Sequence, residues 1–215
     1  MCYDVRTISR WFIENNTDAA NASFNGHLKL QKLLYYAQAM NLAVTDKPLF
    51  EEKIEAWENG PVVKEMFIEY RHNNFSERVK SLPDDYELNN QTRKILQIVN
   101  HIYGTQTGTQ LVELTHSEEP WLELKDLATN RQNPVISQEK IHEYYKPLKD
   151  LFNLYEDYDF THEFAEKING NIFVYNRLET YLDDNDIRNL WEIGEDVKGE
   201  KYFVYKDDQG EMVIY

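Results

Sequence analysis

The chain has 215 residues and a formal net charge of −15, and 41% of its residues are hydrophobic. Enough apolar material is present for a packed core, which excludes disorder along the whole chain, while the excess of acid disfavours binding to nucleic acid. Without an apolar run of about 18 residues or the apolar core of a signal peptide, the sequence predicts a cytoplasmic protein with no membrane partner.

The first part of the sequence predicts successive amphipathic helices. Asp4 is a candidate N-cap for a helix whose apolar residues recur at spacings of three and four. The Asn25-Gly26 pair is expected in a loop. Leu28–Val44 follows as the most apolar segment, with large hydrophobic residues spread around most of its circumference, so we expect a central, largely buried helix.

Two short strands are expected beside these helices. Lys53–Trp57 has the alternation of a strand, and Pro134–Ser137 is a candidate partner for it. Between them, the turn Glu58-Asn59-Gly60 leads to Pro61, which suits the first position of a helix that runs to about Tyr70.

Further helices complete the N-terminal part. One carries Ile95, Ile98, Val99 and Ile102, and the next begins near Thr107, whose spacing to Gln110 fits a capping box. Ser117 is a candidate cap for a short helix with Pro120 in its first turn. Ser137 then opens one long helix whose apolar stripe reaches Tyr155.

Beyond about Asp157 the pattern changes to aromatic and β-branched runs. Ile172–Tyr175 and Tyr202–Tyr205 predict strands, and a polar turn links the second of them to Met212–Tyr215 as a terminal hairpin. Asp184–Trp191 is expected to be a short helix. The fold class is therefore α+β and helix-dominated: a compact multi-helix domain with a short two-stranded element, residues 1–157, then a small acidic α+β appendage, residues 158–215.

Negative charge is concentrated in the appendage. Residues 1–150 contain 17 basic and 22 acidic residues, whereas residues 151–215 contain 6 and 16. Such an imbalance favours a partner protein with a basic surface. The candidate partner-binding residues combine aromatic anchors with acidic side chains: Tyr175, Trp191, Phe203, Tyr205, Asp183, Asp184 and Asp186.

The usual signatures of enzymes are missing from the sequence. Its six histidines show no metal-ligand spacing, and the lone Cys2 cannot build a thiolate site or an internal disulfide. Gly104 to Gly108 lacks the ending of a phosphate loop. Thr115 to Glu118 contains nucleophile, base and acid types, but adjacent residues cannot form a triad. We expect no enzyme activity and no catalytic, cofactor-binding or metal-binding residue.

Three segments together resemble the Panacea domain, also described as the SocA-like or GepA-like antitoxin family of bacteria, phages and prophages. They are Leu28-Lys-Leu-Gln-Lys-Leu-Leu-Tyr-Tyr-Ala-Gln38, Glu55-Ala-Trp-Glu-Asn-Gly-Pro-Val-Val63 and Leu114-Thr-His-Ser-Glu-Glu-Pro-Trp121. The resemblance covers about residues 1–150 and leaves the acidic appendage outside. The motif residues are expected to be structural: Leu30, Gln31, Leu34, Tyr35, Trp57, Gly60, Pro61, His116, Ser117, Pro120 and Trp121.

The resemblance implies an antitoxin that neutralises a toxin encoded beside it by direct binding. Together with the acidic charge of the appendage, it leads us to expect that this binding occludes the toxin's active site. It implies a toxin that targets translation or nucleotides, with the small alarmone synthetase type among the candidates. Three alternatives remain: an adaptor that delivers the toxin to a protease, a prophage-encoded inhibitor of a host defence factor, and an enzyme that reverses toxin damage. Because the appendage is specific to this sequence, it is the candidate for partner choice.

Overall fold

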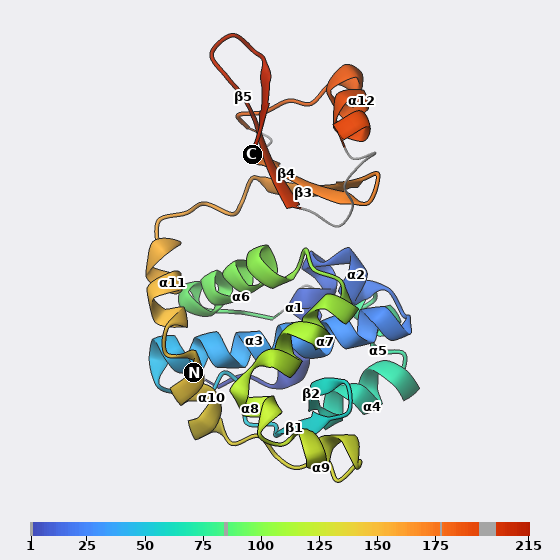
Figure 1. Cartoon of the computed structure of the whole chain (residues 1–215), viewed down its shortest axis with the longest axis vertical. Coiled ribbons are helices and arrows are strands. Elements are labelled where there is room, and N and C mark those ends of the chain that lie inside the picture. The colour runs from blue at the N-terminus through green and yellow to red at the C-terminus, as the bar shows by residue number, and fades with distance from the viewer. Residues whose placement is uncertain (1, 84–85, 177, 194–200) are drawn as a thin grey trace. The chain divides into compact units, whose positions relative to one another are not determined.

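The computed structural model describes residues 2–83, 86–176, 178–193 and 201–215 (Figure 1). The chain divides into two compact units, residues 1–156 (unit 1) and residues 157–215 (unit 2). Unit 1 consists mainly of helices, and unit 2 contains a four-stranded sheet with helix α12 (Asp184–Ile193). The prediction of a helix-dominated α+β protein is confirmed.

The elements of unit 1 are short apart from α3 and α6, and most of them contact α3 directly. In chain order they are α1 (Val5–Asn15), α2 (Thr17–Ala20), α3 (Phe24–Thr45), β1 (Ile54–Trp57), β2 (Gly60–Val63), α4 (Lys64–His72), α5 (Phe75–Val79), α6 (Asn90–Tyr103), α7 (Gly108–Ser117), α8 (Glu119–Leu122), α9 (Lys125–Thr129), α10 (Gln138–Tyr145) and α11 (Leu148–Leu154). In the part of the chain that the structure describes, none of the helices combines the length and the apolar character that crossing a membrane requires.

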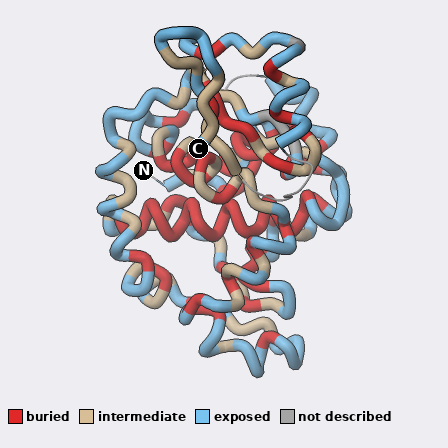
Figure 2. Tube along the Cα trace, turned by 45° about the horizontal axis from the view of Figure 1, so that its top comes forward, coloured by how far each residue is buried: buried red, intermediate tan, exposed pale blue. Residues whose placement is uncertain are grey.

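Helix α3 is the core of unit 1. Every residue from Gly26 to Ala43 is buried, as the continuous red helix in Figure 2 shows. Helices α1, α2, α4, α6, α7, α10 and α11 and strand β2 all contact it. Most polar side chains of a helix covered on all sides are expected to have hydrogen-bond partners within the protein, because water cannot reach them and an unpaired group is costly. The predicted central helix is confirmed.

The start of α3 differs from the sequence prediction, which placed Asn25-Gly26 in a loop. Ser23 is the N-cap and accepts a hydrogen bond from the Gly26 backbone N–H at 3.1 Å, so the helix begins at Phe24. Gly26 lies within the helix, and this position needs a glycine because the neighbouring backbone comes too close for a side chain. A Cβ at Gly26 would lie 2.0 Å from the carbonyl oxygen of Asn21.

Strands β1 and β2 form a tight hairpin in which Trp57 faces Gly60 and Ala56 faces Pro61. The prediction that Pro61 begins a helix is therefore wrong; the helix α4 starts three residues later. Pro61 fits the strand because the Ala56 N–H points away from β2 and donates to the Pro134 carbonyl at 2.8 Å. The Ala56–Pro61 pair thus needs no donor from the proline.

The predicted second strand at Pro134–Ser137 forms only an isolated bridge between Glu55 and Val135. Two backbone bonds hold it to the outer edge of β1: Ala56 N–H donates to Pro134, and Ile136 N–H donates to the Ile54 carbonyl, both at 2.8 Å. The segment then turns into α10, so the pairing does not extend into a strand.

Three of the expected caps are confirmed. Asp4 accepts from the Arg6 N–H, Thr107 forms a capping box with Gln110, and Ser137 accepts from the Lys140 N–H. The prediction of one long helix after Ser137 is wrong in one respect: the segment forms two helices, α10 and α11, which Pro147 separates. Proline has no N–H for the helical ladder, and its ring collides with the preceding turn.

The expected cap at Ser117 is wrong. Ser117 is the last residue of α7, and its Oγ donates to the Leu114 carbonyl at 2.7 Å instead of accepting from the next helix. Glu118 occupies the N-cap position of α8 with an extended backbone. Pro120 lies in the first turn of α8 as predicted, where its missing N–H costs no intrahelical bond.

Unit 2 is a sheet in the order β3-β4-β5-β6, covered on one face by α12. The strands are β3 (Glu163–Ile168), β4 (Asn171–Asn176), β5 (Lys201–Lys206) and β6 (Met212–Ile214). Strands β4 and β5 are parallel and the other pairs antiparallel. The predicted strands, helix and terminal hairpin are confirmed, whereas β3 was not predicted.

The turn of the β1–β2 hairpin generates a prediction. Gly60 has a φ of 92°, and a Cβ there would lie 2.7 Å from Lys32 Cε and 2.8 Å from Thr115 Oγ1. We expect Gly60→Ala to destabilise unit 1 by about 2–4 kcal/mol, as the sum of backbone strain and overpacking. The free energy of unfolding from urea denaturation, followed by the helical circular-dichroism signal, measures this loss.

Gly210 provides the control for backbone strain alone. Its φ is 79°, and a Cβ added there would meet no atom of the described residues within 4 Å. Gly210→Ala is expected to weaken unit 2 by only about 1 kcal/mol. Equal losses at the two glycines would contradict the close contact at Gly60.

Candidate functional site

The side chains of the first motif segment bind the backbone of the β1–β2 hairpin. Gln31 of α3 accepts from the Val63 N–H at 2.7 Å and donates to the Val63 carbonyl at 3.3 Å. Lys32, one residue further, donates through Nζ to the Pro61 carbonyl at 3.1 Å. Both side chains are fully buried. Helix α3 therefore fixes β2 through specific polar bonds as well as through apolar packing.

The third motif segment also holds this hairpin. Trp121 of α8 donates through Nε1 to the Trp57 carbonyl at 2.9 Å. The ring of His116 stacks on Trp121 with ring centroids 3.8 Å apart and hydrogen-bonds to the Glu58 backbone. The three segments that are separate in the sequence thus meet around residues 57–63. We call this group of contacts the hairpin clamp.

Glu118 forms a second buried polar group next to the hairpin clamp. Its carboxylate accepts from the Tyr36 hydroxyl at 3.1 and 3.2 Å and from the Tyr145 hydroxyl at 2.5 Å, while only 8% of the residue is exposed. These bonds tie α3 and α10 to the start of α8. Burial raises the pKa of Glu118 to about 7, although the tyrosine hydrogen bonds oppose that rise.

The pKa values of two basic side chains, Lys32 and His116, shift in the opposite direction. Burial lowers the pKa of Lys32 to about 7. It also lowers the pKa of His116, which the charge of Lys32 lowers further. Lys32 and Glu118 are thus both close to the midpoint of titration near neutral pH. Their polar atoms are used in bonds inside unit 1 and lie too deep to act on a large substrate.

The other motif residues occupy the positions that a structural role requires. Leu30, Leu34 and Tyr35 are buried along α3, and the Tyr35 ring contacts those of Tyr36 and Tyr145. Pro120 is buried, and Ser117 is exposed. Trp57 is half-buried, with its Nε1 donating to Glu55 at 2.8 Å.

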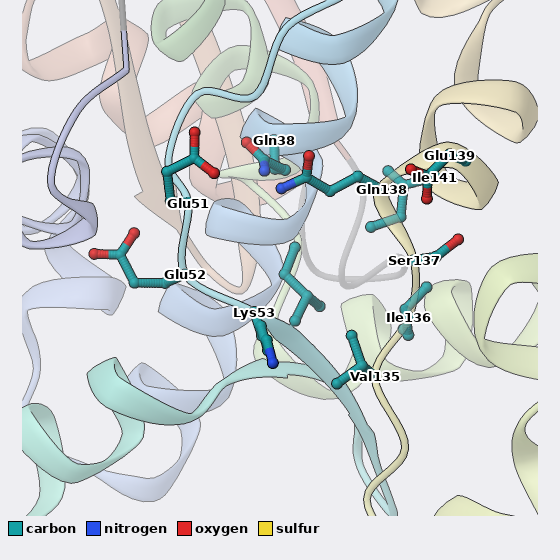
Figure 3. Close-up of a pocket in the computed structure, with 11 residues that line it drawn as sticks. Gln38, Glu51, Glu52, Lys53, Val135, Ile136, Ser137, Gln138, Glu139 and Ile141 are labelled. Atoms are coloured by element: carbon teal, nitrogen blue, oxygen red, sulfur yellow. The ribbon is translucent and has the colours of Figure 1, made fainter.

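A small pocket opens where the segment before β1 separates from the segment before α10 (Figure 3). Its volume is about 160 Å³, well below the several hundred Å³ of typical ligand pockets. The labels in Figure 3 show Gln38 and Gln138 reaching toward the same space from opposite sides. Gln38 is already bonded to the backbone of Leu49 and Phe50. The pocket has room for a few water molecules or one side chain.

No candidate metal centre is found within the described residues, where no three His, Cys, Asp or Glu side chains are grouped to hold an ion. The hairpin clamp has the chemistry of a structural device: it fixes a turn whose residues Glu58 and Asn59 are exposed. The candidate functional surface must therefore be sought among exposed side chains, and the sequence places its candidates in unit 2.

Two of the candidate partner-binding residues are interior. Tyr175 is 7% exposed and belongs to the core between the sheet and α12. Asp186 is 8% exposed, accepts from the Asp183 N–H at 2.9 Å and pairs with Lys206 at 2.6 Å. Asp183 returns the bond by accepting from the Asp186 N–H, so the two residues form a capping box at the start of α12. Neither Tyr175 nor Asp186 presents a free surface to a partner.

Other candidates lie on the surface of unit 2. Trp191 is 52% exposed on α12, and Tyr205 is 45% exposed on β5. Phe203 is half-buried on the same face of the sheet as Tyr205, two residues away. Asp183 is exposed, and the side chain of Asp184 lies outside the described residues. Trp191 is on the helix, so the structure does not group it with the two strand residues.

Sequence reasoning missed several residues of these sites. Lys32 and Glu118 were within the quoted motifs, and a charged residue on an otherwise apolar helix face was the signal that Lys32 needs a buried partner. Glu118 lies between two helices and carried no such signal. Tyr215 was also missed as a contact residue. It is 69% exposed, and its ring stacks with Phe203 and meets the edge of Tyr205.

Comparison with known proteins confirms the resemblance drawn from the three segments. Residues 30–122 match the family model described as antitoxin SocA-like, Panacea domain. The matched range lies within unit 1 and includes the residues of the hairpin clamp. No curated protein and no solved structure matches the chain. The family match supports an antitoxin role.

The titration of Glu118 generates a prediction about pH. Because its folded pKa of about 7 exceeds the ordinary value of 4.5, the folded state binds this proton more tightly than the unfolded state does. The stability that this group contributes is fully present below pH 4.5 and is lost as the pH rises through 7, by up to about 3 kcal/mol.

The variant Glu118→Gln removes this titration but keeps the shape of the side chain. We expect the difference in unfolding free energy between the variant and the original protein to move in favour of the variant between pH 4.5 and 7.5. Urea denaturation at intervals of half a pH unit measures it. A difference that stays constant over this interval would contradict a raised pKa.

Proposed function

Because residues 30–122 match an antitoxin family, we propose that the chain neutralises a toxin encoded beside it by direct protein–protein binding. In this proposal unit 1 is the scaffold and unit 2 docks on a basic active-site surface of the toxin. The observation that carries the proposal is the charge of unit 2. Residues 157–215 contain 15 acidic and 6 basic residues.

Of the basic residues described in unit 2, Arg188 is exposed, whereas two others do less to offset this charge at the surface. Lys206 is paired with Asp186, and burial lowers the pKa of Lys201. The side chains of Glu179, Asp208 and Glu211 are exposed. A surface with this sign accelerates association with a basic partner and slows association with an acidic one.

Exposed aromatic rings supply the second requirement, a slow dissociation. Trp191 and Tyr205 are about half exposed, and large rigid rings of this kind dominate the binding energy of many interfaces. Charge brings the two proteins together, and burial of these rings keeps them together. The half-buried Phe203 and the exposed Tyr215 extend the Tyr205 surface.

The toxin is proposed to act on translation or on nucleotides, and a small alarmone synthetase is one candidate. Such a toxin binds an anionic substrate, so its active site must be basic. An acidic protein surface that covers this site competes with the substrate. The burial of Lys32 and Glu118 favours a mechanism without catalysis, because both groups are bonded inside unit 1.

Removal of unit 2 tests this division of roles. We expect a chain that ends at Glu156 to remain helical but to lose the ability to rescue growth when the protein from the adjacent reading frame is expressed. Circular dichroism establishes that the shortened chain is folded, and colony counts measure rescue. Rescue by this folded chain would show that unit 2 is not the part that neutralises the toxin.

The amount of toxin in rescued cells separates two mechanisms. Occlusion predicts that the toxin persists at its usual level in a complex, as measured by immunoblotting. Disappearance of the toxin would instead indicate delivery to a protease.

Charge substitutions in the full chain test the electrostatic part. We expect the triple variant Glu179→Gln, Asp208→Asn, Glu211→Gln to bind the toxin with an association rate at least threefold lower at low salt. The matched control neutralises three exposed acids of unit 1, namely Glu65, Glu113 and Asp150. Both variants change the net charge equally. Equal slowing by the two variants would indicate that only the total charge matters.

A further inference from the structure

Strand β6 is an outer strand of the sheet of unit 2. The strand order places β3 and β6 at the two ends, and β6 pairs with β5 only. Within the described residues, no strand covers the outer side of β6. An edge strand of this kind offers backbone donors and acceptors to another chain.

The pairing pattern identifies which backbone groups face outward. Phe203 and Tyr215 exchange two backbone bonds, at 2.9 and 3.1 Å, and Asp207 N–H donates to the Glu211 carbonyl at 3.0 Å. Because bonded and unbonded pairs alternate along an antiparallel ladder, Met212 and Ile214 belong to unbonded pairs. Their N–H and C=O groups therefore point away from β5.

The side chains on β6 suit an edge that stays accessible. Met212 and Ile214 pack against the core of unit 2 and are half-buried, so they anchor the strand. Val213 and Tyr215 lie on the opposite face, where Tyr215 contacts the rings of Phe203 and Tyr205. A strand added beside β6 would extend this aromatic surface and bury part of Tyr215.

The end of β6 next to the hairpin turn is acidic. Asp207 accepts from the backbone N–H groups of Gln209 and Glu211, both at 2.9 Å, which fixes the turn. Asp208 and Glu211 are exposed beside it. Lys206, which precedes the turn in the sequence, is paired with Asp186. A chain that pairs with β6 would therefore bring its residues close to uncompensated negative charge.

From these observations we propose that the outer edge of β6 binds an extended, lysine- or arginine-rich segment of the toxin as an additional β-strand. This inference rests on the proposed function, since it names the surface of unit 2 that the toxin contacts. Backbone bonds at Met212 and Ile214 supply the pairing, and the acidic turn selects a basic segment.

A second copy of this chain is a poorer occupant of the edge. Pairing of β6 with itself would bring together two units that each carry a large excess of acidic residues, and like charges facing each other across strands are destabilising. A basic partner relieves the same repulsion. Charge thus favours the toxin over self-association. In this respect β6 differs from an edge strand that is prone to aggregate.

Backbone amide exchange provides the direct test, with the full-length chain and the protein from the adjacent reading frame as the probe. In the free chain, Val213 and Tyr215 should exchange slowly and Met212 and Ile214 quickly. In the complex, NMR should show exchange at Met212 and Ile214 slowed at least tenfold, which removes the alternation. A complex in which these two amides exchange as in the free chain would overturn the proposal.

Two substitutions at one position give an independent test. Ile214→Pro removes the outward N–H, a change that an edge strand tolerates, and keeps apolar bulk. Ile214→Ala keeps the N–H and loses more packing. We expect the proline variant to bind the probe at least tenfold more weakly and the alanine variant to bind within threefold of the original chain. If the alanine variant is the weaker binder, side-chain packing and not strand pairing is responsible.

The outcomes also separate this inference from the proposed function. If both Ile214 variants bind normally while the chain ending at Glu156 does not bind, unit 2 contacts the toxin by another surface and only the strand proposal fails. If the chain ending at Glu156 binds and rescues growth, the proposed role of unit 2 fails as well. A dimer of the chain alone that Ile214→Pro abolishes would assign the edge to a second copy.

Discussion

The structure of unit 1 depends on the hydrogen bonds that polar side chains of a fully buried helix make with neighbouring segments. Helix α3 carries Gln31, Lys32, Tyr36 and Gln38 into the core, where an unpaired polar group costs about 1–3 kcal/mol. Backbone groups of neighbouring segments bond three of them, and Glu118 bonds Tyr36. Each of these hydrogen bonds requires its partner to lie in a fixed direction. The bonds, and not the apolar core alone, therefore determine how the hairpin and α8 are placed on α3.

Much of this arrangement could be predicted from sequence, for identifiable reasons. The apolar circumference of Leu28–Val44 predicted a buried helix, and the caps Asp4, Thr107 and Ser137 were found because side-chain capping depends on local spacing. Pro61 was misplaced because proline suits both a helix start and an unbonded strand position, and only the contact with Pro134 decides between them. Long-range contacts of that kind leave no mark on local spacing.

The unit 2 predictions failed where burial decides the role of a residue. Asn169-Gly170 was an overlooked signal for a hairpin: both residues have positive φ, as a two-residue turn requires, and the preceding β3 follows from it. Tyr175 was expected at the surface, but alternation along β4 directs it to the core beneath α12.

The antitoxin resemblance could be predicted because the bonds around residues 57–63 demand particular residue types in three separate segments. The proposed binding surface lies outside those segments.

The central claim is that neutralisation occurs by direct binding. The most direct measurement is purification of the chain together with the protein from the adjacent reading frame, from cells in which both are expressed, at a series of salt concentrations. The account predicts a stable complex that contains intact toxin, whose affinity falls as salt rises because acidic and basic surfaces meet. Rescue of growth without any complex, and with the toxin intact, would contradict it and require an enzymatic or indirect mechanism.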